Sequence, residues 1–593
     1  MKKFFKTTFA CVLGTLIAGL ILMIIMFVGI IGSVATSLPS AQKNYVVKEN
    51  TVLKLDLKGV TKDQYEEDVN LDVTSLMNKQ DNDVLGLDQF RRALEVAAED
   101  ANVKGIYISA EGLSAMPASV DEMRRALVQF KEKSGKWIYA YADSYTQNDY
   151  VIASVADKVI INPLGSVNIH GLGGTQIFFP GAFEKFGVEY QIFRVGTYKS
   201  AVEPFMVKKM SDANREQTLA YLNTIWDNYT EAVTSSRNIT AEMFNAIADS
   251  IIALRPTEDM LRFNLVDTMM YRPQVEEWLK AQIGIEDDKE INFASVSELA
   301  SAPKKEELSE NKIALVYAEG EINDAGEGLT SEKFVPLFTK IRKDDNVKAV
   351  VLRVNSPGGS AYASEQMWAE LEAIQAAGKK VIVSMGEVAA SGGYYISCGA
   401  DYIFAENNTL TGSIGVFGMM PCARKIATET LGLSFDAART HKHSDFNSGE
   451  FLYVGLSPEE SAAMQRSVEN TYDLFTRRCA EGRNMTQDDI KKIAEGRVWV
   501  GKTAQTLGLV DEIGSLEDAI AYAAKVSELE KYEIATYPTT ESAFEKIMKK
   551  LGQHTQVSLM TWVLGKDAQF LQSLLDAENN ALIQARMENV IIR

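Results

Sequence analysis

The apolar and polar positions of the chain follow the pattern of strands and helices in alternation. An alternating segment at 51–57 is typical of an edge strand. A helical pattern at 87–100 leads into a nearly continuous apolar run at 105–109, and a second helical pattern at 120–133 leads into another such run at 137–142. Continuous apolar runs between amphipathic helices indicate parallel strands whose sheet is covered on both faces. The pattern therefore predicts an α/β fold.

The second part of the chain repeats this order. Its corresponding segments lie at 331–343, 349–354, 365–377 and 380–384. Short matching stretches also recur at a single separation of 244 residues: 102–106 with 346–350, 156–158 with 400–402, and 265–267 with 509–511. Several matches in one register indicate a duplicated domain. We therefore expect two homologous halves, each followed by a helix-rich stretch (211–237 and 457–483).

The N-terminus has a different pattern. Lys2, Lys3 and Lys6 precede an apolar run at 9–34, which as a helix would be about 39 Å long. This length can cross a hydrocarbon core of about 30 Å with some tilt, and the lysines would keep the N-terminus in the cytoplasm. A cleaved signal peptide is the competing interpretation, because small residues stand at 33–35. We predict an uncleaved transmembrane anchor at 1–36.

The duplication and the pattern of apolar and charged residues divide the rest of the chain into four predicted parts. We expect the first half at 37–295, a charged linker at 296–312, the second half at 313–530 and a helical tail at 531–593. The tail contains no motif that indicates its function.

Composition and charge narrow the choice of partners. Of the 593 residues, 46% are hydrophobic and 24% charged, which is ordinary for a globular protein. The formal net charge of −19 argues against nucleic acid and the anionic inner face of a membrane as partners. Cys398, Cys422 and Cys479 form no CxxC pair, so neither a zinc site nor a dithiol redox site is predicted. The sequence leaves their disulfide state open.

Two segments of the second half have the composition of a catalytic site. The loop at 355–359 reads Asn-Ser-Pro-Gly-Gly, and such a turn frees backbone N–H groups that can bind a developing oxyanion. Ser391 stands in an Ala-Ala-Ser-Gly-Gly-Tyr-Tyr run at a predicted strand-to-helix turn, where the helix N-terminus favours negative charge. An ordinary turn and a helix-capping serine are the structural alternatives.

The first half lacks both features. Its loop at 111–115 reads Glu-Gly-Leu-Ser-Ala, and Gln147 stands at the position of Ser391. Loss of both features together is expected if they work as a unit, whereas two independent turns would not need to vanish together.

A nucleophilic serine needs a base. Lys199 of the first half corresponds to His443 or, with a slip of one residue, to Lys442. A lysine can act as a base when desolvation lowers its pKa to about 7–8, and small and apolar residues flank Lys199. A solvated surface lysine is the structural alternative, and His443 is the rival base. We predict that one half supplies the base and the other the nucleophile, with the site where the halves meet.

The longest motifs resemble one family, the long form of signal peptide peptidase A, also called protease IV. They are Val-Gly-Thr-Tyr-Lys-Ser-Ala-Val-Glu-Pro-Phe at 195–205, Arg-Val-Asn-Ser-Pro-Gly-Gly-Ser at 353–360, and the run around Ser391. The resemblance covers most of the chain. It implies tandem ClpP/crotonase-like domains and a serine–lysine dyad, with Lys199 as general base and Ser391 as nucleophile.

The same resemblance implies further site residues and an assembly. Backbone N–H groups of Gly358, Gly359 and Gly392 would bind the oxyanion, and Ser413 is a candidate for orienting Lys199. Family members are similar in forming bowl-shaped homotetramers at the inner (cytoplasmic) membrane, with the catalytic body on the periplasmic side. They cut remnant signal peptides without ATP, metal or another cofactor. We therefore expect a single-pass serine endopeptidase that degrades cleaved signal peptides and similar hydrophobic peptides.

Two other classes of function share parts of this pattern. A crotonase-type acyl-CoA enzyme would share the oxyanion loops but would use carboxylates, and it is usually cytoplasmic, which the predicted anchor argues against. A non-catalytic membrane scaffold fits the duplication and the acidic charge, but it needs neither small residues around Ser391 nor Lys199 in the other half. The cleavage preference and the lining of the S1 pocket stay open.

Overall fold

The computed structural model describes residues 14, 19, 45–65, 84–286, 288–303, 309–446, 451–539 and 583–587. The predicted anchor at 1–36 lies outside these residues, apart from two isolated glycines. Among the helices that are described, none has both the length and the apolar character that crossing a membrane requires.

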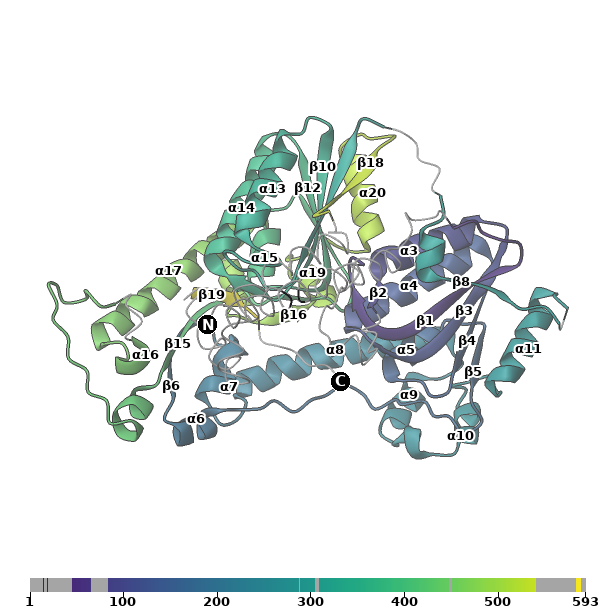
Figure 1. The fold of residues 1–593 in the computed structure, drawn as a ribbon, viewed down its shortest axis with the longest axis horizontal. Coiled ribbons are helices and arrows are strands. Elements are labelled where there is room, and N and C mark those ends of the chain that lie inside the picture. The colour runs from purple at the N-terminus through teal and green to yellow at the C-terminus, as the bar shows by residue number, and fades with distance from the viewer. Residues whose placement is uncertain are drawn as a thin grey trace, which may run out of the picture.

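The first half is built on a seven-stranded parallel sheet (Figure 1). Its strands run in the order β2 (Val84–Gly86), β1 (Thr51–Lys62), β3 (Val103–Ser114), β4 (Trp137–Ala142), β5 (Lys158–Ile161) and β7 (Thr268–Met269), with β8 (Asn292–Ser295) also paired to β1. The predicted strands at 105–109 and 137–142 are confirmed. The edge position predicted for 51–57 is wrong, because β3 pairs with one side of β1 while β2 and β8 share the other.

The helices follow the amphipathic patterns of the sequence. In the first half, α3 buries Leu87, Phe90, Leu94 and Ala97, spaced three or four residues apart, so that one face packs on the sheet. The described helices of this half are α3 (Leu87–Glu99), α4 (Pro117–Ser134), α5 (Gln147–Ala153), α6 (Pro180–Phe186), α7 (Glu203–Met206), α8 (Asp212–Ser236), α9 (Ala241–Ala248), α10 (Thr257–Arg262), α11 (Arg272–Ile283) and α12 (Val296–Ala300).

The second half repeats the parallel core. Its sheet runs in the order β16 (Val498–Val500), β14 (Leu410–Gly412), β12 (Lys380–Ala390), β10 (Val347–Ser356), β9 (Lys312–Glu319) and β18 (Glu533–Tyr537), with β13 (Tyr402–Ala405) and β17 (Glu512–Ile513) attached beside β12. Only the β14–β16 pair among these is antiparallel. The helices are α13 (Ser331–Lys343), α14 (Ala361–Ala376), α15 (Gly392–Ser397), α16 (Phe451–Val454), α17 (Pro458–Gly482), α18 (Gln487–Ile493), α19 (Gly501–Thr506) and α20 (Leu516–Val526). The predicted α/β duplication is confirmed.

A third, antiparallel sheet joins distant parts of the chain. Its order is β11 (Gly358–Ser360), β19 (Ile583–Arg586), β15 (Val416–Cys422) and β6 (Glu189–Val195). Figure 1 shows β6 of the first half running beside β15 of the second half in the left-hand arm of the molecule. The sequence pattern did not predict this sheet.

The tail and the linker differ from their predictions. The two described stretches of the predicted helical tail contain strands, because β18 pairs with β9, and β19 pairs with both β11 and β15. The rest of 540–593 lies outside the described residues. The start of the predicted linker is α12, whose Val296 and Leu299 are buried in the apolar core of the first half.

The three described cysteines of the second half are Cys398, Cys422 and Cys479. All three are buried free thiols.

Buried ion pairs also connect the halves. Arg353 on β10 is 1% exposed, and its guanidinium contacts Asp63 at 2.8 Å and Glu122 at 2.7 Å, both in the first half. Burial alone would raise the pKa of Glu122, but the guanidinium groups of Arg353 and Arg91 outweigh this effect and hold that pKa well below its usual range. Glu122 is therefore charged near neutral pH, and Arg353 is the cation that it shares with Asp63.

We predict that Arg353→Met lowers the free energy of unfolding by about 3–5 kcal/mol, because it leaves two buried carboxylates without their shared cation. Denaturant titration of the purified chain measures this loss. Arg342→Met is the matched control, because the Arg342 side chain is 32% exposed and lies 3.5 Å from Glu370, so its loss should cost about 0–1 kcal/mol. Equal losses in the two variants would contradict a special role for the buried pairs.

Candidate active site

Ser391 occupies a strained turn between β12 and α15. Its φ of 55° and ψ of −112° place a non-glycine residue at positive φ, a conformation that costs about 1–3 kcal/mol and persists only where its surroundings enforce it. Its N–H donates to Gly412 O at 2.8 Å, and its carbonyl accepts from Tyr395 N at 2.8 Å. The predicted strand-to-helix turn is confirmed, with the serine fixed by backbone bonds on both sides.

The small residues after Ser391 permit close packing. A Cβ on Gly392 would lie 2.7 Å from Ser364 Oγ, and a Cβ on Gly393 would lie 2.6 Å from Ser356 O. Both distances are too short for a side chain. The Gly-Gly pair therefore lets the start of α15 approach the end of β10.

Lys199 reaches Ser391 from the first half. Its Nζ donates to Ser391 Oγ at 2.8 Å, and it also lies 3.2 Å from both the carbonyl oxygen and the Oγ of Ser413. Lys199 is 1% exposed, and both serines are buried. The structure thus brings together three predicted site residues from segments up to 214 positions apart.

The second half surrounds the backbone of Lys199 closely. A Cβ on Gly496 would lie 2.7 Å from Lys199 Cβ, and a Cβ on Gly415 would lie 3.2 Å from Lys199 Cδ. Glu495 accepts from Tyr198 N through its carbonyl at 2.9 Å and from Thr197 N through its carboxylate at 2.9 Å. Lysine and serine are therefore held by contacts that cross between the halves.

Gln217 supports the lysine segment from α8. This buried side chain donates through Nε2 to Tyr198 O at 3.0 Å and to Ser200 Oγ at 2.8 Å, and its Oε1 accepts from Val498 N at 3.2 Å. Sequence reasoning missed Gln217, because one polar residue in a long helix gives no signal of its own.

The predicted oxyanion glycines meet at one point beside Ser391. Gly358 has a φ of 95° and Gly359 a φ of 154°, which glycine adopts without strain. A Cβ on Gly358 would lie only 2.5 Å from Gly392 N and 2.1 Å from Ala585 O. The Gly358 loop, the start of α15 and a carbonyl of β19 therefore converge.

The strand β19 was not predicted and lies in the middle of this region. Gly359 is the register partner of Ala585, and Gly418 of β15 is the partner of Ile583. Met587 N donates to Pro357 O at 2.7 Å. A tail segment thus pairs on one side with the glycine loop and on the other with β15.

In the first half, side chains of the same half fill the hydrogen-bonding positions of the equivalent loop and turn. The Asp149 carboxylate accepts from Gly112 N at 3.1 Å and from Leu113 N at 3.0 Å, in the loop that corresponds to 355–359. Gln147, at the position of Ser391, donates to Gly171 O at 3.1 Å. Because these two N–H groups already donate to the Asp149 carboxylate, they are not available to bind a substrate oxyanion.

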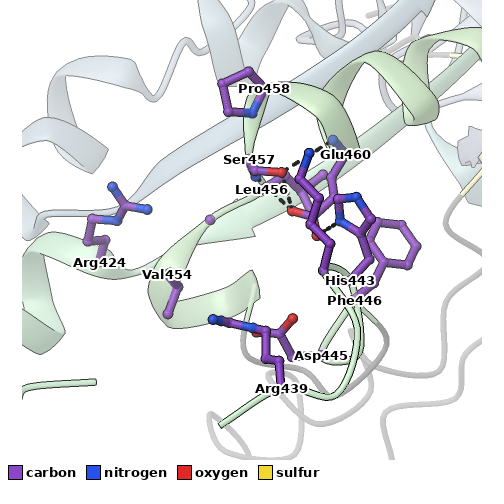
Figure 2. A pocket seen from close by; sticks show the side chains of 12 residues that line it. Arg424, Arg439, His443, Asp445, Phe446, Val454, Leu456, Ser457, Pro458 and Glu460 are labelled. Atoms are coloured by element: carbon purple, nitrogen blue, oxygen red, sulfur yellow. Dashed lines mark hydrogen bonds and ion pairs between the residues drawn. The ribbon is translucent and has the colours of Figure 1, made fainter. Parts of the chain in front are cut away.

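The rival base His443 lies elsewhere. Figure 2 shows it in a cavity of about 430 Å³ beside α17, where its Nδ1 is 2.8 Å from Glu460 Oε1. The lining of this cavity contains neither Lys199 nor Ser391. His443 therefore does not contact the serine.

Comparisons with known proteins point to one family. A model described as peptidase family S49 matches residues 130–286 and 373–530, once in each half. "Protease 4" of Salmonella typhi is 36% identical over 469 residues, which are 77% of this chain and 75% of that protein. "Protease 4" of Haemophilus influenzae is 37% identical over 72% of this chain and 71% of that protein.

Two more distant matches complete the comparison. "Serine protease SPPA, chloroplastic" of Arabidopsis thaliana is 30% identical over 92% of this chain and 79% of that protein. A solved structure of a ClpP1 mutant from Listeria monocytogenes aligns with 35% of this chain and 94% of that chain, at 17% identity and a TM-score of 0.24. That structural likeness is too weak to add to the family match.

We predict that Gly496→Ala slows labelling of Ser391 by a fluorophosphonate probe by about 10²-fold, because the new methyl group would displace Lys199 from Ser391. Mass spectrometry of the labelled peptide measures the rate. Gly378→Ala is the matched control: its φ of 86° resembles the 75° of Gly496, but a Cβ there would meet nothing within 4 Å. If Gly378→Ala slows the labelling of Ser391 as much as Gly496→Ala does, the slower labelling is caused by backbone strain and not by the contact with Lys199.

Proposed function

The chain belongs to peptidase family S49, and on this premise we propose that it is a membrane-anchored serine endopeptidase in which Lys199 and Ser391 form a catalytic dyad. The observation that carries the proposal is the 2.8 Å contact between Lys199 Nζ and Ser391 Oγ inside a buried site. Family membership makes the chain a serine peptidase, and it sets aside both the acyl-CoA enzyme and the non-catalytic scaffold.

In the proposed reaction, the neutral amine of Lys199 accepts the hydroxyl proton of Ser391 while Oγ attacks a peptide carbonyl. Burial disfavours the charged form of an amine, which suits this role. The resulting ammonium then donates its proton to the departing amine, and the C–N bond breaks to leave an ester on Ser391. Water, activated by the same amine, hydrolyses the ester and restores the serine.

The oxyanion site is proposed where the glycines converge. Backbone N–H groups of the Gly358–Gly359 loop and of Gly392 would stabilise the negative oxygen of the tetrahedral intermediate. The N–H of Gly358 donates to Ser356 Oγ at 3.2 Å in the structure and would have to share or exchange this partner. Their closeness to a backbone carbonyl of β19 supports this assignment, because a substrate carbonyl would need the same position. Ser413, within 3.2 Å of Lys199 Nζ, would orient the amine.

The substrate is proposed to be an extended peptide. The glycine loop and β15 pair with a strand that lies between them and not with each other, so backbone pairing on both sides favours a segment without folded structure. Remnant signal peptides and similar hydrophobic peptides fit this requirement. The proposal also includes an anchor at 1–36, which the sequence pattern suggests, and a homotetramer with its catalytic body on the periplasmic side of the inner membrane, which the family resemblance suggests.

We predict that Ser391→Ala and Lys199→Ala each lower kcat for a fluorogenic hydrophobic peptide by about 10⁴-fold or more, since each removes one member of a unit. Lys208→Ala is the matched control, because this lysine of the same half is exposed and pairs only loosely with Glu184 at 3.4 Å. His443→Ala tests the rival base. A near-normal kcat in Lys199→Ala, or a loss of kcat in His443→Ala as large as that expected for Lys199→Ala, would refute the dyad.

We predict a smaller effect for Ser413→Ala. The substitution removes one of the two Ser413 contacts to Lys199 Nζ and leaves the contact to the carbonyl oxygen in place. Loss of a hydrogen bond of about 0.5–1.5 kcal/mol lowers kcat by about tenfold at most. Steady-state kinetics should show this decrease in kcat with KM little changed, and an unchanged kcat would remove Ser413 from the site.

A further inference from the structure

A buried glutamine on α8 lies between the lysine segment and the second half. Gln217 is 0% exposed. Its Nε2 donates to Tyr198 O at 3.0 Å and to Ser200 Oγ at 2.8 Å, and these two residues are the sequence neighbours of Lys199. The side chain therefore holds the lysine segment on both sides of the proposed base.

The other end of the same carboxamide reaches the strands that support the nucleophile. Oε1 of Gln217 accepts from Val498 N on β16 at 3.2 Å. Val498 is the register partner of Gly412 on β14, and the carbonyl of Gly412 accepts from Ser391 N at 2.8 Å. One side chain thus links the backbone beside the base to the backbone that fixes the nucleophile.

This bridge needs a hydrogen-bond donor at one end and an acceptor at the other. The carbonyl of Tyr198 requires a donor and the N–H of Val498 requires an acceptor, and the carboxamide of Gln217 provides both. An ionised carboxylate lacks the donor, and an apolar side chain lacks both groups. Either replacement would leave buried backbone groups without this partner.

A second buried network fixes the position of Gln217 itself. The carboxylate of Glu203, four residues after Lys199, accepts from Ser211 Oγ at 2.5 Å and from Asn214 Nδ2 at 3.0 Å. Ser211 is the N-cap of α8, and Asn214 Oδ1 lies 3.4 Å from Gln217 Nε2. The lysine segment and the first turns of α8 are therefore held together, with the carboxamide facing the second half.

We propose that Gln217 is a positioning residue of the dyad, which sets the place of Lys199 relative to Ser391 where the two halves meet. This inference rests on the proposed function. The hydrogen bonds of Gln217 go to the residues beside Lys199 and to β16, so it acts through the lysine segment. A displacement of about 1 Å can slow an enzymatic step by about 10²-fold. Loss of the bridge should therefore slow the reaction of Ser391 while each half keeps its fold.

Gln217→Met tests the bridge, because methionine has a similar length but no donor and only a weak acceptor. A fluorophosphonate probe provides two separate measurements: the final extent of labelling counts folded sites, and the rate of labelling reports how reactive Ser391 is. We expect a rate about 10²-fold lower at an unchanged final extent. A merely structural role would lower the final extent and leave the rate at the remaining sites unchanged.

Gln147→Met is the matched control in the first half. Gln147 is also buried, and its carboxamide also joins two backbone groups, because it donates to Gly171 O at 3.1 Å and accepts from His170 N at 3.0 Å. Both of these partners lie within the first half, so the labelling rate should stay near that of the wild type. A decrease as large as that in Gln217→Met, or a wild-type rate in Gln217→Met, overturns the inference.

Gln217→Glu keeps the shape of the side chain and the acceptor of the bridge, so it decides the question if Gln217→Met does not fold. The charged groups near this position include Lys199, Glu203 and the ion pair of Glu216 with Arg497. A further carboxylate beside the lysine segment favours the ammonium form of Lys199. The acid limb of the labelling rate should therefore move to higher pH. An unchanged acid limb overturns the inference, and so does the absence of reactive sites in both variants, since Gln217 would then be required for folding.

Hydrolysis of a hydrophobic peptide by the wild type separates this inference from the proposed function. If the wild type cleaves the peptide and both Gln217 variants react as the wild type does, only the positioning role fails. If the wild type neither cleaves the peptide nor reacts with the probe, the proposed function itself fails.

Discussion

A buried amine must meet a buried hydroxyl that lies 192 residues away in the sequence, and this requirement governs how the halves are joined. The β6–β15 ladder brings the lysine segment to the second half, and the close approach at Gly496 fixes it there. Arg353, on the strand before the oxyanion loop, forms ion pairs with carboxylates of the first half. The site therefore exists only while both halves hold their relative positions.

The duplication explains why the chemistry is divided. Each half retains the parallel sheet that can present a loop and a helix N-terminus at its edge, but only the second half has Ser391 there, beside a glycine loop in which Gly358 N donates to the Ser356 hydroxyl and not to a carboxylate. In the first half, Asp149 satisfies the amides of the matching loop. A carboxylate in that place would repel a developing oxyanion, so the first copy can serve as a support for Lys199 without a competing site of its own.

The sequence predicted those parts of the molecule that local patterns determine. The core strands and helices and the turn at Ser391 follow from periodicity and motifs, and the meeting of Lys199 with Ser391 was predicted by comparing the two halves. The place of Ser413 was implied only by the resemblance to a family. The third sheet could not be predicted, because apolar periodicity reports which face of a strand is buried and not which distant strand will pair with it. For the same reason β1 was misplaced at an edge, and the four residues of β19 gave no signal.

The third sheet also bears on the substrate that we propose. β11 and β15 both pair with β19 and not with each other, and strand edges held this far apart favour an extended segment between them. A folded protein cannot offer such a segment, since its strands are already paired. Selectivity for unfolded peptides and the pairing of β19 with both β11 and β15 would then have one physical cause, namely two strand edges held one strand apart.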